Sequence, residues 1–328
     1  MPPPFTGLTP DVVLDALDSV GLQGDGRMLA LNSYENRVYQ VAMADGPPYV
    51  AKFYRPGRWT DAQILEEHGF VGELAAEEIP AVEPLAFSGR TLATFAGFRF
   101  AVYPNCGGRA PELEDRATRE WLGRFIGRIH AVGGRTRFAA RPALDIASFG
   151  VEPRDWLLAH GFIPPDLDAA YRSVADMALA GVRECFARAG EVRVLRLHGD
   201  CHAGNVLWLP EGPRAGPHFV DFDDSRMGPP IQDLWMLLAG DRDEMARALG
   251  DLLAGYEDFQ IFDRRELHLL EALRTLRLIH YAAWLARRWD DPAFPAAFPW
   301  FNTQRYWQDR ILELREQIGA MDEPPLAV

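Results

Sequence analysis

The pattern of apolar and polar positions changes about one third of the way along the chain. Three early segments are rich in strand-forming residues and partly alternate between apolar and polar side chains, namely residues 37–43, 47–55 and 98–104. Residues 59–77 show helical spacing instead, with Thr60 or Asp61 as the N-cap. The order strand, strand, helix, strand predicts a small antiparallel sheet with one helix packed on it. The apolar stripe of that helix would consist of Ile64, Leu65, Phe70 and Leu74.

A cluster of glycines and prolines within residues 104–115 interrupts this pattern, and helical patterns dominate beyond it. The helices are expected over residues 120–133, 233–240 and 266–289. Between the first two, the sequence predicts a short strand that ends near Leu197, followed by a hairpin whose arms are residues 205–209 and 218–224 and whose turn is residues 210–217.

These patterns predict an α/β fold with two lobes. Residues 1–104 would form a small N-terminal lobe with an antiparallel sheet and one helix, residues 105–110 a hinge, and residues 111–328 a larger, mainly helical C-terminal lobe. The length of 328 residues and a hydrophobic fraction of 48% are sufficient for two cores.

Charge and cysteine content narrow the classes of partner. The net charge of −13 and the scattered arginines disfavour nucleic-acid binding. The three cysteines are widely separated and odd in number, which fits a reducing compartment. The N-terminus has no secretory signal pattern, and the apolar runs are too short to span a bilayer. We therefore expect a cytoplasmic protein without membrane contacts, and a monomer.

The candidate chemistry lies in "LHGDCHAGNVLW" and in "FVDFDDS", which follows it. Asp200 and Asn205 share a loop that leaves a strand, and Asp221 ends the returning arm of the hairpin, so we expect these three side chains to converge. Two carboxylates and an amide oxygen are ligands that suit Mg²⁺. The imidazoles of His198 and His202 keep zinc open as an alternative.

Such a set of groups is typical of phosphoryl transfer. Asp200 would accept the proton of the attacking hydroxyl, or orient that hydroxyl, while Asn205 and Asp221 would hold Mg²⁺ on the phosphates. Asp223 would support a second ion or cap the next turn. A buried lysine in an apolar strand needs a carboxylate partner, so we expect an acidic side chain beside Lys52 in the N-terminal lobe.

The spacing D-x4-N followed by D-F resembles the catalytic loop and metal-binding turn of protein kinases, and H-G-D-x4-N resembles more closely their aminoglycoside phosphotransferase/choline kinase branch. Longer strings, which include "LNSYENRVYQ", "KFYRPGRWTDAQILEEH", "LRLHGDCHAGN", "QDLWMLL" and "WDDPAFPAAFPW", resemble the bacterial stress response kinases of that branch. The resemblance implies a kinase-like two-lobed fold. It also implies Mg²⁺-dependent transfer of phosphate from ATP to Ser/Thr of proteins, in a stress response.

The resemblance also implies roles for further residues. Lys52 would clamp the ATP phosphates and pair with Glu67, although the preceding Glu66 could take that place. His198 and Asp233 would support the catalytic loop, with Asp233 bonded to the loop amides. The remaining ATP-binding candidates are Ser33 in a loop that lacks the usual glycines, and Tyr103 and Asn105 at the hinge.

Three alternatives stay open at this point. The acceptor could be a small molecule such as homoserine, an amino alcohol or an aminoglycoside, and the acidic balance of the chain would suit a cationic acceptor. The chain could also be an ATP-binding scaffold without catalysis, although the intact set of Lys52, Asp200, Asn205 and Asp221 argues against it. The aromatic residues 289–301 could line a substrate groove or form a packed loop.

One regulatory expectation follows from two departures from eukaryotic protein kinases. Gly199 replaces the arginine that would bind a phosphorylated activation loop, and the chain between Asp221 and Asp233 is too short for a long activation segment. The sequence thus predicts a protein that is active without phosphorylation of that segment.

Overall fold

The computed structural model describes residues 3–212 and 215–328, and these form two compact units. The N-terminal unit comprises Met1–Pro111, Ala139–Arg141 and Ala203–Asp224, and the C-terminal unit comprises Glu112–Phe138, Pro142–His202 and Ser225–Val328. The hairpin within residues 203–224 therefore groups with the N-terminal sheet, although it follows that sheet by about a hundred residues in the chain. The predicted lobe boundaries at residues 104 and 110 stay a prediction.

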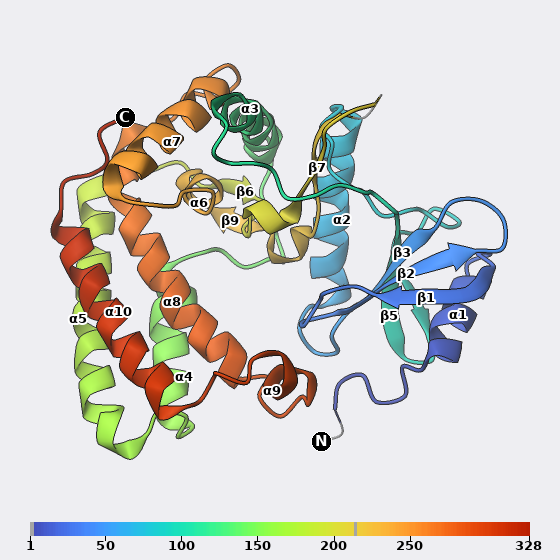
Figure 1. Cartoon of the computed structure of the whole chain (residues 1–328), viewed down its shortest axis with the longest axis horizontal. Coiled ribbons are helices and arrows are strands. Elements are labelled where there is room, and N and C mark those ends of the chain that lie inside the picture. Colours follow the sequence, from blue (N-terminus) through green and yellow to red (C-terminus); the bar gives the residue numbers. More distant parts are fainter. Residues whose placement is uncertain (1–2, 213–214) are drawn as a thin grey trace. The chain divides into compact units, whose positions relative to one another are not determined.

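The N-terminal unit is built on a five-stranded antiparallel sheet with the order β1-β2-β3-β5-β4. Figure 1 labels β1, β2, β3 and β5 of this sheet. In register, Lys52 of β3 lies between Val38 of β2 and Ala101 of β5. The elements of this unit are α1 (Pro10–Asp18), β1 (Gly24–Ala30), β2 (Arg37–Met43), β3 (Tyr49–Phe53), α2 (Asp61–Ala76), β4 (Ala93–Phe95), β5 (Phe98–Pro104), the 3₁₀ turn η2 (Ala203–Asn205), β7 (Val206–Leu209), β8 (Gly216–Phe219) and the 3₁₀ turn η3 (Phe222–Asp224).

Helix α2 begins as the sequence predicts. Thr60 is the N-cap, and its hydroxyl accepts from the Gln63 N–H while the Gln63 side chain accepts from the Thr60 N–H, which forms a capping box. Ile64 packs against Tyr54 of the sheet layer. The prediction that Leu65 belongs to the apolar stripe is wrong. Adjacent residues of a helix point in different directions, and Ile64 faces the core while Leu65 is exposed.

Sequence patterns missed strands β1 and β4 and helix α1 of this unit. Strand β1 has no alternation to detect, because most of its residues are exposed and its register against β2 shifts between Gly24 and Met28. Strand β4 has only three residues. The hairpin of β7 and β8 is present, whereas Pro213 and Arg214 of its predicted turn lie outside the described residues.

The C-terminal unit is mainly helical. Helices α5, α8 and α10 run side by side (Figure 1), and α4 packs on α8. Its elements are α3 (Arg116–Gly133), the π-helical turn η1 (Ala147–Val151), α4 (Glu152–Ala159), α5 (Pro165–Ala189), β6 (Leu195–Leu197), β9 (Arg226–Gly228), α6 (Ile231–Trp235), α7 (Arg242–Tyr256), the 3₁₀ helix η4 (Arg264–Leu269), α8 (Leu270–Ala286), α9 (Ala293–Ala297) and α10 (Gln304–Asp322).

Glycines let α3 and α7 approach closely. A Cβ on Gly123 of α3 would overlap the backbone carbonyl of Leu252, and a Cβ on Gly255 of α7 would overlap that of Glu120. The predicted helix at residues 233–240 is shorter than expected. Helix α6 ends at Trp235, and the chain then turns at Gly240 into the N-cap of α7. Gly240 has a φ of 91°, a left-handed conformation that glycine adopts without steric cost.

The antiparallel sheet, its helix and the following helical unit confirm the predicted α/β class. Among residues 3–212 and 215–328, no helix has both the length and the apolar character that a membrane crossing requires.

Candidate active site

A cavity of about 310 Å³ lies within the N-terminal unit. It is bordered by strands β2, β3 and β5, by α2, and by the segments that follow η2 and β8. Seven residues that the sequence indicated as candidates line it: Ser33, Lys52, Glu67, Tyr103, Asn105, Asn205 and Asp221. The fold therefore brings the N-terminal ATP-binding candidates together with both predicted metal ligands.

Lys52 provides the positive charge of this cavity. Its side chain is buried, and its Nζ lies 2.9 Å from Asp221 Oδ1 and 3.4 Å from Asp223 Oδ1. Burial alone would lower the pKa of Lys52, but the carboxylates of Asp221 and Asp223 outweigh it and hold that pKa well above its usual range. Lys52 is therefore a permanent cation at the wall of the cavity.

The partner of Lys52 differs from the predicted one. Glu67 lines the cavity, but its Oε2 lies 3.6 Å from Arg141 Nη1, while Lys52 pairs with Asp221 and Asp223. Burial raises the pKa of Glu67 to about 7, against the lowering effect of Lys52. Glu66 points elsewhere and accepts from the backbone N–H groups of residues 139–141. Of the two glutamates, Glu67 is the one turned toward the cavity.

Asp223 is buried among cationic side chains. Its side chain is only 3% exposed, and its carboxylate contacts Lys52, Arg58 and the Asn36 amide. Burial opposes ionisation, yet Arg58 and then Lys52 lower the pKa of Asp223 to about 2. These cations offset the charge of Asp223, and its support of a second ion stays a prediction.

Two short segments complete the cavity wall. The Ser33 hydroxyl donates to the Asn36 carbonyl at 3.2 Å in the loop between β1 and β2, which compacts this loop without the usual glycines. At the end of β5, the hydroxyls of Tyr103 and Tyr54 lie 3.0 Å apart, and Tyr54 also contacts His68 at 2.7 Å. The ring of Tyr103 is thereby fixed, while Asn105 follows it along the cavity edge.

Asn205 and Asp221 lie together because the backbones of their segments are bonded. The Val220 N–H donates to the Asn205 carbonyl at 3.0 Å, and both side chains border the cavity. Asp221 has a φ of 58° and a side chain that is 54% exposed, which directs its carboxylate outward. A half-exposed carboxylate beside an amide fits a hard divalent cation that retains water and phosphate ligands.

Within the described residues, no cluster of three or more His, Cys, Asp or Glu side chains suits a metal, so zinc gains no support.

The catalytic-loop candidates lie in the C-terminal unit, where Asp233 organises them. Its carboxylate accepts from the N–H groups of His198 and Gly199, each at 2.8 Å, which are the contacts the sequence predicts for it. His130 Nε2 lies 3.1 Å from the same carboxylate, and Gln232 donates to the Gly199 carbonyl at 3.1 Å. His198 is fully buried, and its Nδ1 faces the Asp200 N–H at 3.3 Å.

Sequence reasoning missed the partner of Asp200. Arg277 Nη1 of α8 lies 2.8 Å from Asp200 Oδ1, and His202 Nε2 lies 3.5 Å from Oδ2. Arg277 is separated from Asp200 by 76 intervening residues, and its helical pattern carried no sign of this contact. The convergence of Asp200 on Asn205 and Asp221 stays a prediction, because Asp200 belongs to the other unit.

The aromatic residues 289–301 are mostly packed inside the C-terminal unit. Phe294, Phe298 and Phe301 are buried, and Trp284 of α8 contacts the first two of them. Only Trp300 keeps a largely exposed ring in this cluster of tryptophans and phenylalanines, so this part of the chain favours the packed-loop interpretation.

Comparison with known proteins is decisive for the family. Residues 28–270, which contain Lys52, Asp200, Asn205 and Asp221, match the phosphotransferase enzyme family. The chain belongs to that family. The match confirms the resemblance that the catalytic-loop spacing indicated.

Relatives that match nearly the whole chain of this phosphotransferase are stress response kinases. Stress response kinase A of Escherichia coli strain K12 is 46% identical over 322 residues, which cover 98% of this chain and 96% of the relative. The serine/threonine protein kinase RdoA of Salmonella typhimurium strain LT2 is 45% identical over the same shares of the two chains. Family and relatives together support kinase activity for this phosphotransferase.

Solved structures confirm the kinase-like fold of the phosphotransferase. The amicoumacin kinase hAmiN, solved with AMP-PNP, Ca²⁺ and Ami, superposes with a TM-score of 0.71 at 20% identity and covers 97% of this chain and 94% of its own. A microcompartment-associated aminopropanol kinase gives a TM-score of 0.70 at 18% identity, covering 96% and 97%. At these identities the similarity concerns the fold alone.

Proposed function

We propose that this protein transfers the terminal phosphate of ATP, with Mg²⁺, to serine or threonine hydroxyls of protein substrates. The observation that supports this most is the shared cavity, where the Lys52 cation, the Asp221 carboxylate and the Asn205 amide border one space. These are the groups that phosphoryl transfer requires for holding phosphates and a divalent ion.

Each residue has a distinct part in the proposed reaction. Lys52 neutralises charge on the phosphates, and the backbone and hydroxyl groups of the Ser33 loop donate to them. Asp221 and Asn205 would hold Mg²⁺, which supplies charge neutralisation on the transferring phosphate when bound. Asp200 orients the acceptor hydroxyl and takes up its proton. The Asp233 carboxylate fixes the backbone of the loop that carries Asp200.

One observation favours a protein acceptor over a small cationic one. A relative that matches nearly the whole chain is named a serine/threonine protein kinase.

The test uses γ-labelled ATP with either Mg²⁺ or excess chelator. Parallel reactions contain myelin basic protein, an aminoglycoside, or an amino alcohol as the acceptor. We expect Mg²⁺-dependent label on serine and threonine of the protein and none on the small molecules. Label on a small molecule alone would replace the protein acceptor, and no transfer to any acceptor under Mg²⁺ would contradict kinase activity.

A further inference from the structure

The segment "YRPGRWT" joins β3 to α2, and the proposed catalytic roles leave it unexplained. Its arginines do not extend into solvent as loop arginines usually do. The side chain of Arg58 is 10% exposed, and its guanidinium contacts the Asp223 carboxylate and lies 2.8 Å from Asp224 Oδ1 and 3.9 Å from Glu35 Oε2. One guanidinium therefore contacts three carboxylates from two distant parts of the chain.

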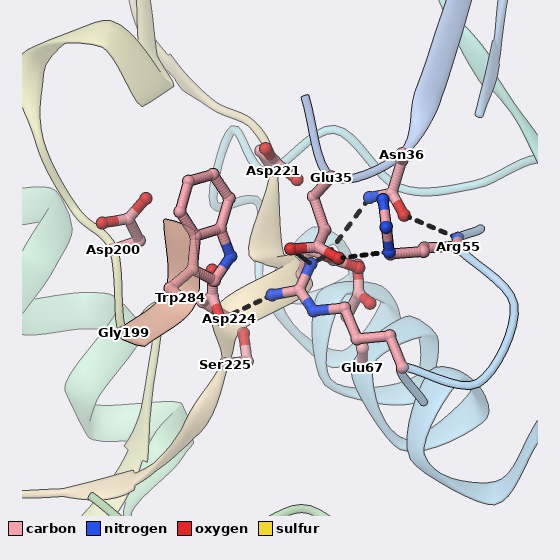
Figure 2. A network of polar contacts seen from close by, with 12 residues as sticks. Glu35, Asn36, Arg55, Glu67, Gly199, Asp200, Asp221, Asp224, Ser225 and Trp284 are labelled. Atoms are coloured by element: carbon pink, nitrogen blue, oxygen red, sulfur yellow. Dashed lines mark hydrogen bonds and ion pairs between the residues drawn. The ribbon is translucent and has the colours of Figure 1, made fainter. Parts of the chain in front are cut away.

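Neighbouring contacts reinforce this connection. Arg55 Nε lies 3.6 Å from Glu35 Oε1, and the Arg55 N–H donates to Asn36 Oδ1 at 3.1 Å, as Figure 2 shows. The Asn36 amide in turn donates to Asp223 Oδ2 at 3.2 Å. The loop before β2 and the turn after Asp221 are thus bonded both to each other and to the same segment.

An aromatic platform holds the guanidinium groups in place. The Trp59 ring lies 5.1 Å from the Arg58 guanidinium and 4.6 Å from that of Arg141. Arg141 donates to the Asp223 carbonyl and, at 2.8 Å, to the Gln63 carbonyl of α2. Stacking limits the rotamers of Arg58, so its fork meets the carboxylates at little further entropic cost.

We propose that Arg58 is a positioning residue: through Asp223, Asp224 and Glu35 it fixes the turn after Asp221 against the loop before β2, and thereby places the Lys52 ammonium for nucleotide phosphates. The proposal rests on the proposed function insofar as a nucleotide occupies the cavity. Asp223 carries the effect, because this buried carboxylate lies between two cations, with Lys52 Nζ at 3.4 Å and Arg58 on its other oxygen.

The arrangement has a regulatory consequence. In protein kinases whose activity is switched, an arginine meets a phosphate that is added to the activation segment, and the new pair orders the site. Here the acidic groups are part of the chain, in Asp223 and Asp224, and the arginine comes from the β3–α2 segment. The pairing exists without modification, so the site is ordered as soon as the protein folds.

The test measures binding of ADP without divalent metal, by calorimetry, to folded full-length protein. The variants are Lys52→Ala, Arg58→Ala and the double variant, with Arg90→Ala as the control because Arg90 is an exposed arginine of the same unit. We expect Lys52→Ala and Arg58→Ala each to weaken ADP binding ~10-fold, and the double variant to be no weaker than Lys52→Ala alone. Millimolar guanidinium should restore part of the affinity of Arg58→Ala, and Arg90→Ala should bind as the wild type does.

Two results would overturn the inference. Wild-type affinity in Arg58→Ala would show that Arg58 positions nothing, and multiplying effects in the double variant would show that it does not act through Lys52. If Arg58→Ala does not fold, Arg58→Lys and Asp224→Asn replace it, and each should weaken ADP binding several-fold only while Lys52 is present. If the wild type does not bind ADP even after Mg²⁺ is added, the proposed function is overturned as well.

Discussion

The ammonium of Lys52 lies 2.9 Å from the carboxylate of Asp221, which follows it by 169 residues in the chain. The ammonium is buried, whereas the carboxylate is about half exposed. A bound metal and a bound phosphate would both have to approach this pair, so the two residues should affect nucleotide and metal binding differently.

Replacing Asp221 by Asn should impair metal-dependent turnover far more than binding of metal-free ADP. The amide keeps the shape and an oxygen ligand but loses the charge that attracts the cation. We expect kcat to fall ~10²-fold or more and the Mg²⁺ concentration for half-maximal rate to rise. A Mg²⁺ titration of initial rates measures both, and a titration curve that matches the wild type would remove Asp221 from the metal site.

The contact between α3 and α7 predicts a stability effect remote from the cavity. Gly123→Ala should destabilise the protein by ~1–3 kcal/mol, because the added carbon overlaps the Leu252 carbonyl. Gly250→Ala in α7 is the control, since its Cβ would meet no atom within 4 Å apart from the backbone of its own helix. That change should stabilise by ~0.5–1 kcal/mol through helix propensity. Thermal unfolding compares them, and equal shifts in Tm would refute the close packing.

The buried carboxyl of Glu266 predicts a pH dependence of stability. Its Oε2 accepts from the Ile231 N–H at 2.8 Å, and burial raises the pKa of Glu266 from 4.5 to about 8. The folded state therefore binds this proton more tightly than the unfolded state, so its contribution to stability is complete below about pH 4.5 and is lost as the pH rises toward 8.

Glu266→Gln removes this ionisation while keeping an acceptor oxygen for the Ile231 N–H. The Tm of the variant relative to the wild type should accordingly rise between pH 5 and pH 8, by on the order of 5 °C. Melting curves of both proteins at the two values of pH provide the comparison. A Tm difference that does not change with pH would show that Glu266 titrates normally.

Ser225 carries the hydroxyl nearest to Asp221 in sequence, and we expect it to have no regulatory role. Its side chain is fully buried, and its hydroxyl donates to the His198 carbonyl at 3.4 Å, so a kinase could not reach it in the folded protein. Phosphatase-treated protein, checked by mass spectrometry, and Ser225→Ala should both keep initial rates within about twofold of the untreated wild type. A large loss of rate in either would reveal a phospho-switch.

Sequence patterns were sufficient where local chemistry determines the structure. The cap at Thr60 follows from a hydroxyl before an apolar helix. The contact of Asp233 with the loop amides was instead implied by the resemblance to kinases, because it joins segments that are distant in the chain. Strand β1 escaped prediction because glycine, charge and exposure remove its alternation. Strand β1 is recognised only from its backbone pairing with β2, which its own residue pattern does not indicate.

Charged pairs between distant segments could not be predicted in the same way. Lys52 has acidic residues available on α2 and on the turn after β8, and only the fold decides that Asp221 and Asp223 are its partners. The same holds for Arg277 and Asp200. A buried charge requires a partner, but spacing along the chain does not say which one.

The most direct test of the account compares phosphate transfer to protein serine by the wild type and by Asp200→Asn. The control is Asp168→Asn, which changes a partly exposed carboxylate of α5 whose ion-pair partner is Arg172. We predict that Asp200→Asn lowers the initial rate by ~10²–10⁴-fold and leaves the affinity for ADP within about twofold of the wild type. Asp168→Asn should match the wild type in both. Equal transfer rates for Asp200→Asn and the wild type would contradict the assignment of Asp200, and with it the proposed phosphoryl-transfer site.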